Sequence, residues 1–155
     1  MTLVTATPVL DPSLYIAELK PRTRETVLVQ MVGAAQRAGA VRGSASLLEL
    51  LRLRERIGST AIGKGAAVPH ARSITVDRPV LVVARSHRGI EWDAPDAQPV
   101  HLVLLALSPG EWGEEAHHAF LSRVAAVARL QRNRQRLLDA ADFTEVAAVL
   151  REAHP

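Results

Sequence analysis

The chain has 155 residues, a formal net charge of +3 and no cysteine. This length suits one domain with a sizeable core, and the missing cysteine excludes disulfides, zinc ribbons, iron–sulfur clusters and thiol catalysis. The 19 Lys and Arg residues are spread along the chain and aromatic residues make up 3% of it, which argues against a nucleic-acid-binding platform.

Two patterns bear on location and boundaries. No apolar run approaches the roughly 20 residues needed to cross a bilayer. The N-terminal segment Met1–Val4 lacks a basic stretch followed by an apolar one. We therefore expect no signal peptide, no direct membrane insertion and a cytoplasmic protein. Residues 1–13 predict a loose lead-in, and residues 14–152 predict a single domain.

Helical patterns dominate the first third of the chain. Residues 14–17 predict a short strand, and apolar positions at helical spacing predict a helix over residues 22–38 that ends at Gly39. Ser46 and Glu49 have the spacing of a capping box, in which each side chain bonds a free backbone N–H of the first turn. A second helix is therefore expected to begin at Ser46 and to end near residue 56.

The rest of the chain places two buried strands before further helices. Residues 79–84 and 100–107 are almost continuously apolar, which is typical of strands covered on both faces. Residues 87–89 predict a turn after the first of these strands. Helical spacing resumes over residues 114–130, and Asn133 and Asp142 are predicted to be the N-caps of two short helices. This order predicts an α/β fold, a sheet covered by helices.

The segment from Arg54 to Arg72 carries the most chemical information. Its three glycines permit unusual backbone angles, and exposed N–H groups in such a turn can bind an anion. Pro69 fixes the backbone before His70, and several cations lie nearby in the sequence. A neutral imidazole can attack phosphorus while cations neutralise phosphoryl oxygens. A phosphoryl-accepting histidine therefore fits the segment, as does a structural histidine among turn-forming glycines.

Other functional classes fit less well. His70 with the neighbours His117 and His118 supplies nitrogen ligands, but adjacent residues point about 100° apart on a helix and suit one metal ion poorly. Neither Ser59 nor any other serine lies in a Gly-x-Ser-x-Gly elbow of a hydrolase. The carboxylates of residues 91–96 indicate a polar turn more simply than an acid–base pair.

Several motifs in one consistent order resemble the enzyme IIA domain of the bacterial phosphotransferase system, fructose/mannitol class, including its nitrogen-regulatory relatives. The resemblance covers roughly residues 14–152. The residues that carry it are Arg54-Glu55, Gly58-Ser59-Thr60, Ile62-Gly63, Pro69-His70, Asp93-Ala94, Asp96, Gln98-Pro99-Val100, His117 and Leu121-Ser122-Arg123-Val124-Ala125. It implies a three-layer α/β/α sandwich with a mixed central sheet.

The resemblance also implies a function and a set of site residues. His70 matches the histidine that takes a phosphoryl group, on Nε2, from the phosphocarrier protein HPr or its nitrogen-branch counterpart. Arg54 matches the arginine that contacts phosphoryl oxygens, and His117 matches the second active-site histidine, although a slip of one residue would give that role to His118. No cofactor or metal is implied. Three further residues are expected to contact phosphate or a partner: Thr60, Lys64 and Arg72.

The resemblance leaves the downstream partner open. One possibility is an active component of sugar uptake that passes the group to a IIB partner. The other is a regulatory binding module whose phosphorylation state controls a target protein. Ala61, Lys64 and His101 depart from the residues usual in the family, which affects partner choice. Apolar residues near the nucleophile, Ile62, Ala66 and Val68, are expected to form a docking patch for the carrier.

Overall fold

The computed structural model describes residues 7–155. The predicted lead-in therefore lies partly outside the described residues, and the segment Met1–Val4 lies wholly outside them. In the described part, Val9 forms a parallel bridge with Val80. The 3-10 helix η1(Pro12–Leu14) follows, and Asp11 caps it by accepting a hydrogen bond from the backbone N–H of Ser13.

Strands occupy the middle of the chain and helices lie mainly at its two ends. The helices of the described residues after η1 are α1(Arg24–Arg37), α2(Ala45–Ile57), α3(Glu114–Arg129), α4(Gln131–Asp139) and α5(Phe143–Ala153). The strands are β1(Tyr15–Ile16), β2(Ala61–Gly63), β3(Ala66–Ala67), β4(His70–Ser73), β5(Val80–Ile90) and β6(Val100–Pro109). The short strand expected at residues 14–17 is confirmed as β1.

One mixed sheet joins all the described strands. Its order is β1-β5-β6-β3-β2, and β4 also pairs with β6. The pair β5–β6 is antiparallel, whereas β3 and β4 both run parallel to β6. Strand β6 thus has β5 along one side and β3 followed by β4 along the other. The predicted mixed sheet is confirmed, and β4 forms its edge beside the end of β6.

Strands β5 and β6 are buried on both faces, as their continuous apolar sequences predict. Val82 pairs with Leu105 in one core, and the next pair, Val83 with Leu104, belongs to the other core. Successive side chains of a strand point to opposite faces, so an unbroken apolar run supplies two cores at once.

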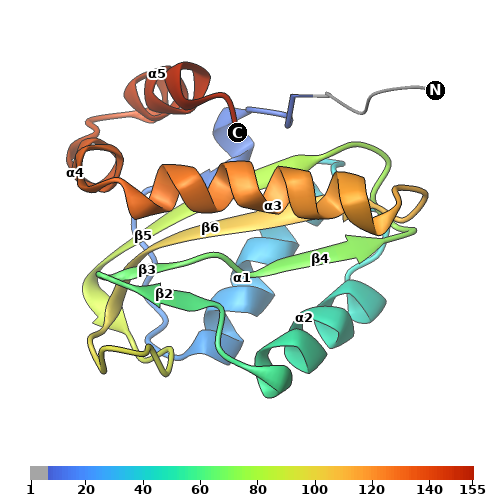
Figure 1. The fold of residues 1–155 in the computed structure, drawn as a ribbon, viewed down its shortest axis with the longest axis horizontal. Helices are drawn as coiled ribbons and strands as arrows, with labels where there is room; N and C mark the ends of the chain where they lie inside the picture. The colour runs from blue at the N-terminus through green and yellow to red at the C-terminus, as the bar shows by residue number, and fades with distance from the viewer. Residues whose placement is uncertain (1–6) are drawn as a thin grey trace.

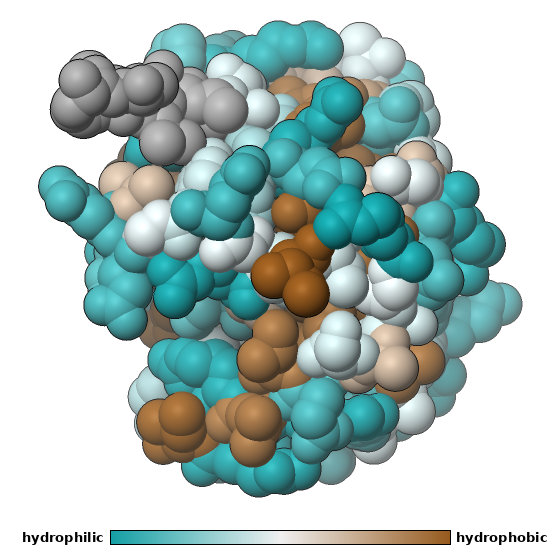
Figure 2. Space-filling model, turned by 90° about the vertical axis from the view of Figure 1, so that its right-hand side faces the viewer, coloured by the Kyte–Doolittle hydropathy of each residue, from teal (hydrophilic) through white to brown (hydrophobic). Residues whose placement is uncertain are grey.

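The two cores separate three layers. Helices α1 and α2 pack on one face of the sheet, and α3, α4 and α5 cover the other (Figure 1). The predicted three-layer α/β/α sandwich is therefore confirmed. On the face that Figure 2 shows, hydrophobic side chains gather in small groups separated by hydrophilic ones.

The helix boundaries expected from capping patterns are partly wrong. Helix α1 begins at Arg24, two residues later than predicted, with Thr23 as its N-cap. Helix α2 begins at Ala45 after Ser44, so the predicted capping box at Ser46 is not formed. The carboxylate of Glu49 instead forms ion pairs with two arginines of the same helix, Arg52 and Arg56.

The last two helices give one wrong boundary and one correct boundary. Helix α4 begins at Gln131 with Leu130 as its N-cap, so Asn133 lies inside the helix. The guanidinium of Arg134 donates to the carbonyls of Ala128 and Arg129, which ends α3 without a longer loop. Asp142 is the N-cap of α5 as predicted, because its Oδ1 accepts from the N–H of Glu145 at 3.1 Å.

The turn predicted at residues 87–89 is wrong, because β5 continues through it. Arg85 pairs with Leu102 and Ile90 pairs with Val100, so the intervening residues bulge out of the ladder. Gly89 has φ +96 there, and a Cβ at this position would lie 2.9 Å from the Cβ of Pro99. Glycine permits this backbone and this close approach, so the chain kinks without reversing.

Candidate functional site

His70 is the first residue of the edge strand β4. Its Cα partner on β6 is Ala106, whose side chain belongs to the core beneath α3, so His70 points to the α3 side of the sheet. The ring nitrogen Nδ1 lies 3.0 Å from the carbonyl oxygen of Val68. A carbonyl can only accept, so Nδ1 carries the proton and the lone pair of the neutral ring is on Nε2.

Arg54 reaches this nitrogen from the opposite layer. It lies on the last turn of α2, on the α1–α2 side of the sheet, and α2 packs against β4. Its Nε donates to Nε2 of His70 at 3.2 Å, and its Nη1 donates to the carbonyl oxygen of Gly58 at 2.8 Å. Because β4 is the edge strand, a side chain from the other layer can reach His70 around it.

His117 approaches from the other direction, on the first turn of α3. Its ring centroid lies 5.9 Å from that of His70. Its Nδ1 lies 2.7 Å from Oγ of Ser108, a buried residue near the end of β6. The ring centroid of His118 lies 6.0 Å from that of His117. The histidine whose ring lies beside His70 is therefore His117, and His118 adjoins His117.

Both histidines are held in the neutral form. Burial lowers the pKa of His70 below its ordinary value, the hydrogen bond to Val68 opposes this, and the charge of Arg54 lowers it further. Burial, together with the charges of His70 and Arg72, lowers the pKa of His117 to about 4. A neutral ring on His70 leaves its Nε2 lone pair available as a nucleophile.

Thr60 lies beside the site but is turned into the protein. It is 5% exposed, and its N–H and hydroxyl both donate to the buried carboxylate of Glu55. Glu55 also pairs with Arg24 of α1, with 3.5 Å between Nη1 and Oε1. Thr60 therefore ties the loop after α2 to the helix that carries Arg54.

The structure separates the two remaining predicted cations. Arg72 lies two residues after His70 on the same face of β4, and its Nη1 donates to the carbonyl of Trp112 at 2.8 Å. Lys64 lies in the β2–β3 turn, where Gly65 is bonded to His101 on β6. That position is about 15 Å along the strand from the partner of His70. The site thus contains Arg72 and excludes Lys64.

In the β2–β3 turn, one of the N–H groups that were expected to bind an anion is already used within the protein. The N–H of Lys64 donates to Oδ2 of Asp96 at 2.8 Å, and Oδ1 of the same carboxylate accepts from Gln98. The carboxylate of Asp96 thus holds two segments of loop together. This bears out the interpretation of residues 91–96 as a polar turn.

Comparison with known proteins decides the family. Residues 8–153 match the family model described as "Phosphoenolpyruvate-dependent sugar phosphotransferase system, EIIA 2". The nitrogen regulatory protein of Bradyrhizobium diazoefficiens is 30% identical over 145 residues, which cover 93% of each chain. The fructose-specific EIIABC component of Bacillus subtilis is 31% identical over 122 residues, which are 79% of this chain and 19% of that protein.

A solved structure agrees with the sequence relatives. The nitrogen regulatory protein IIA-Ntr of Neisseria meningitidis superposes with a TM-score of 0.82 at 27% identity, over 92% of this chain and 96% of that one. The chain belongs to the EIIA type 2 family. Domains of this family are phosphohistidine relay components of a phosphotransferase system, so this EIIA chain is a phosphotransferase component.

The docking patch expected around the nucleophile is wrong for this EIIA chain. Ala66 and Val68 are buried in the α3-side core, and Ile62 packs against it half-buried. Ala66 is buried because β3 lies inside the sheet, between β2 and β6. Exposed apolar side chains lie instead on α2, beside Arg54.

Sequence reasoning missed two residues that support the EIIA site. Glu55 was matched only as part of a motif, and Ser108 was not singled out. Both are buried polar residues, 7% and 0% exposed, next to residues that were predicted. A polar residue at the end of an apolar strand, as Ser108 is after Leu107, was the available signal.

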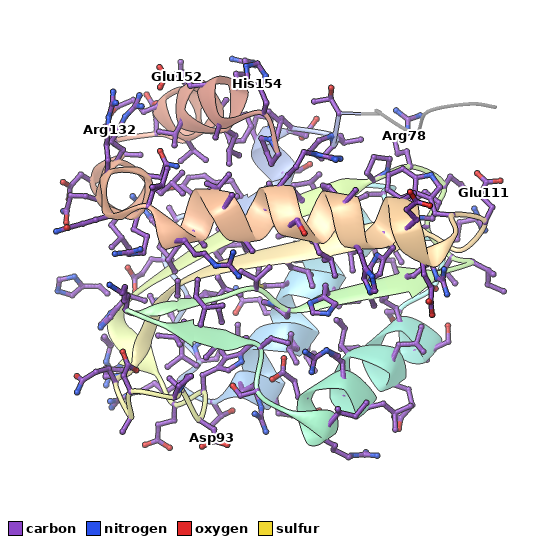
Figure 3. The ribbon with its side chains drawn as sticks, viewed as in Figure 1. Arg78, Asp93, Glu111, Arg132, Glu152 and His154 are labelled. Atoms are coloured by element: carbon purple, nitrogen blue, oxygen red, sulfur yellow. The ribbon has the colours of Figure 1, made fainter. Side chains whose placement is uncertain are left out.

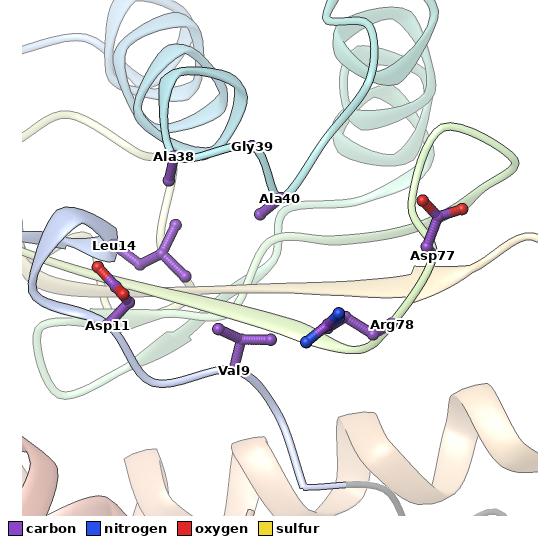
Figure 4. Close-up of a pocket in the computed structure, with 8 residues that line it drawn as sticks. All are labelled: Val9, Asp11, Leu14, Ala38, Gly39, Ala40, Asp77 and Arg78. Atoms are coloured by element: carbon purple, nitrogen blue, oxygen red, sulfur yellow. The ribbon is translucent and has the colours of Figure 1, made fainter.

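Other features of the EIIA chain lie apart from His70. A pocket of about 280 Å³ lies between the N-terminal segment, the end of α1 and the start of β5, lined by Val9, Leu14 and Arg78 among others (Figure 4). The charged side chains labelled in Figure 3, such as Asp93 and Arg132, lie at the periphery.

Two features are absent from residues 7–155. No group of three or more His, Asp or Glu side chains is placed to hold a metal ion. No helix in this part of the chain is long and apolar enough to span a bilayer.

Proposed function

We propose that His70 accepts a phosphoryl group on Nε2 from HPr or its nitrogen-branch counterpart and passes it to a partner protein. The observation that carries this proposal is the arrangement of three side chains. Nδ1 of His70 is bound to a backbone carbonyl, and Nε2 faces Arg54 with the ring of His117 beside it. Membership of the EIIA family supports the same role.

The reaction exchanges one nitrogen–phosphorus bond for another. The lone pair on Nε2 of His70 attacks phosphorus, the bond to the donor's ring nitrogen breaks, and its electron pair stays on that donor nitrogen. Because both nitrogens belong to imidazoles, the driving force is small and the step is reversible. The protein contributes positioning and charge neutralisation rather than a cofactor.

Arg54 has two positions in this mechanism. In the resting protein its Nε–H occupies the Nε2 lone pair of His70, which must be free for attack. On arrival of the phosphoryl group the guanidinium moves from that nitrogen to the phosphoryl oxygens, where its planar fork suits two of them. The bond from Nη1 to the carbonyl of Gly58 keeps the side chain close to the site in both positions.

His117 and Arg72 complete the surroundings of the transferred group. His117 is neutral at pH 7, so one of its ring nitrogens can donate a hydrogen bond to a phosphoryl oxygen. Arg72 points to the same side of β4 as His70 and adds a positive charge near His117. Thr60 is bonded to Glu55 and holds the loop, without contact to phosphate.

The donor is proposed to dock on α2. Leu50, Leu53 and Ile57 of this helix are 40%, 45% and 83% exposed. At spacings of three and four residues they share one helix face with Arg54. An apolar surface next to the nucleophile gives a carrier protein an area to bury while its own phosphohistidine is brought to His70.

The proposed downstream acceptor is a IIB protein. The name of the Bacillus subtilis relative, a fructose-specific EIIABC component, supports a partnership of this kind. A regulatory target is the second candidate. It is favoured by the similarity to the Bradyrhizobium diazoefficiens nitrogen regulatory protein, which extends over 93% of both chains.

Intact-mass spectrometry tests the proposal. Wild type and His70→Ala are incubated with phosphoenolpyruvate, enzyme I and HPr, or with the nitrogen-branch donors, and their masses are compared. We expect the wild type to gain one phosphoryl group that is lost in mild acid, and the variant to gain none. A folded wild type that gains no phosphoryl group from any donor contradicts the proposal and leaves a binding module.

A further inference from the structure

Ser108 occupies an unusual position beside the second histidine. It is 0% exposed, near the end of β6, and its Cα partner on β4 is Arg72. Its Oγ lies 2.7 Å from Nδ1 of His117. In the described part of the chain, this ring nitrogen is the hydrogen-bond partner of the Ser108 hydroxyl.

The direction of this hydrogen bond follows from what each group can do. A serine hydroxyl has one proton and two lone pairs, and a neutral imidazole has one N–H and one bare nitrogen. If Nδ1–H donated to Oγ, the hydroxyl proton of Ser108 would be buried without an acceptor, which costs free energy. If the hydroxyl donates to a bare Nδ1, its proton is satisfied.

The consequence concerns the other nitrogen of the ring. We infer that Ser108 donates to Nδ1 of His117 and thereby fixes the tautomer in which Nε2–H is the donor to the phosphoryl group on His70. This inference rests on the proposed function of His70. It makes Ser108 a positioning residue, because it acts on the phosphoryl group through His117 and does not touch it.

The lowered pKa of His117 strengthens the argument. A protonated ring would carry a proton on both nitrogens, and there would then be no tautomer for Ser108 to select. With a pKa of about 4, the ring is neutral at pH 7 and holds one proton. The position of that proton then decides whether His117 offers the phosphoryl group a donor or a repelling lone pair.

The tautomer can be measured without any phosphoryl transfer. Long-range ¹H–¹⁵N correlation spectra of the ¹⁵N-labelled full chain at pH 7 distinguish a protonated ring nitrogen from a bare one. His117→Gln assigns the signals of His117 by their loss. We expect a protonated Nε2 and a bare Nδ1. A wild-type spectrum with the proton on Nδ1 overturns the inference, whether or not any variant folds.

Removing the hydroxyl tests its part in setting the tautomer. In Ser108→Ala we expect a substantial share of His117 to carry its proton on Nδ1, and phosphoryl acceptance to slow by about tenfold, as for one lost hydrogen bond in the transition state. Ser86→Ala is the matched control, because Ser86 is a strand serine with 1% exposure whose Oγ accepts from Gly89. It should leave the tautomer and the rate unchanged.

The outcomes separate the two proposals. A Ser108→Ala variant with the wild-type tautomer overturns the role of Ser108, even if His70 is phosphorylated normally. Wild type that accepts no phosphoryl group contradicts the proposed function, even if the tautomer is as inferred. A shifted tautomer together with a slowed rate supports both.

Discussion

Nε of Arg54 donates a hydrogen bond to Nε2 of His70 at 3.2 Å. The bond passes around the edge of the sheet, because Arg54 lies on the α1–α2 side and His70 points to the α3 side. The nitrogen proposed to attack phosphorus is therefore occupied in the resting protein by the group proposed to stabilise the product. When the guanidinium of Arg54 leaves Nε2 for the phosphoryl oxygens, the nucleophile is freed as the phosphoryl group is bound.

Removal of this guanidinium should slow the reaction strongly. For Arg54→Ala we expect phosphoryl acceptance from HPr to fall by about a hundredfold, as for loss of one preorganised donor in a transition state. Arg56→Ala is the matched control, since Arg56 lies two residues along α2 and pairs with Glu49. Quenched-flow single-turnover assays measure the rate of phosphoryl acceptance of both variants. Equal rates in the two variants would contradict the role of Arg54.

Phosphoryl acceptance should decline at a lower pH than it would for a histidine of ordinary pKa. The neutral ring is the nucleophile, and burial lowers the pKa of His70, so the ring stays neutral to a lower pH. Acceptance should hold as the pH falls past about 6.5, the ordinary value for histidine. It should decline only as the pH falls through the lowered pKa.

Single-turnover rates from a prephosphorylated donor, with the acid lability of the donor measured in parallel, give this profile. A titration of His70 followed by NMR gives the pKa directly. A midpoint at or above 6.5 in either measurement would show that burial does not act on His70 as described.

The exposed apolar face of α2 should affect donor binding rather than chemistry. Ile57→Glu places a charge on the side chain that is 83% exposed beside Arg54. We expect the apparent KM for HPr to rise about tenfold with little change in kcat. Leu138→Glu on α4, exposed at 37%, is the control for a surface charge on the other face of the sheet. If both variants raise KM equally, the donor does not dock on α2.

The buried carboxylate of Glu55 should matter for stability. Glu55→Ala leaves the N–H and hydroxyl of Thr60 without their acceptor and Arg24 without its partner. We expect the free energy of unfolding in urea to fall by about 3 kcal/mol. Glu49→Ala removes an exposed carboxylate from the same helix and should cost less than about 1 kcal/mol. A Glu55→Ala variant as stable as Glu49→Ala would refute the network.

The sequence predicts the fold best where apolar residues follow one another without a break. Residues 79–84 and 100–107, which lie at or near the starts of β5 and β6, are apolar at almost every position, as is typical of strands that are covered on both faces. Boundaries were predicted less well, because tertiary contacts compete with local capping. Glu49 forms ion pairs with arginines of its own helix instead of a capping box. Arg134 donates to backbone carbonyls at the end of α3, so no longer loop follows that helix.

The site residues also differ in how well the sequence predicts them. His70, Arg54 and His117 were found through the family resemblance, since they lie on three elements whose meeting no local pattern predicts. Lys64 was expected in the site because it is near His70 in the sequence, but the β2–β3 hairpin carries it along β6 away from His70. Ala66 and Val68 were expected on the surface for the same reason and are core residues.

The position of the bond to phosphorus tests the central claim most directly. The protein is labelled with ¹⁵N, phosphorylated by the enzyme I and HPr system, and examined for coupling between ³¹P and the ring nitrogens of histidine. The hydrogen bond from Nδ1 to Val68 predicts that phosphorus is bonded to Nε2 of His70. Phosphorus on Nδ1 of His70, or on His117, would contradict the account.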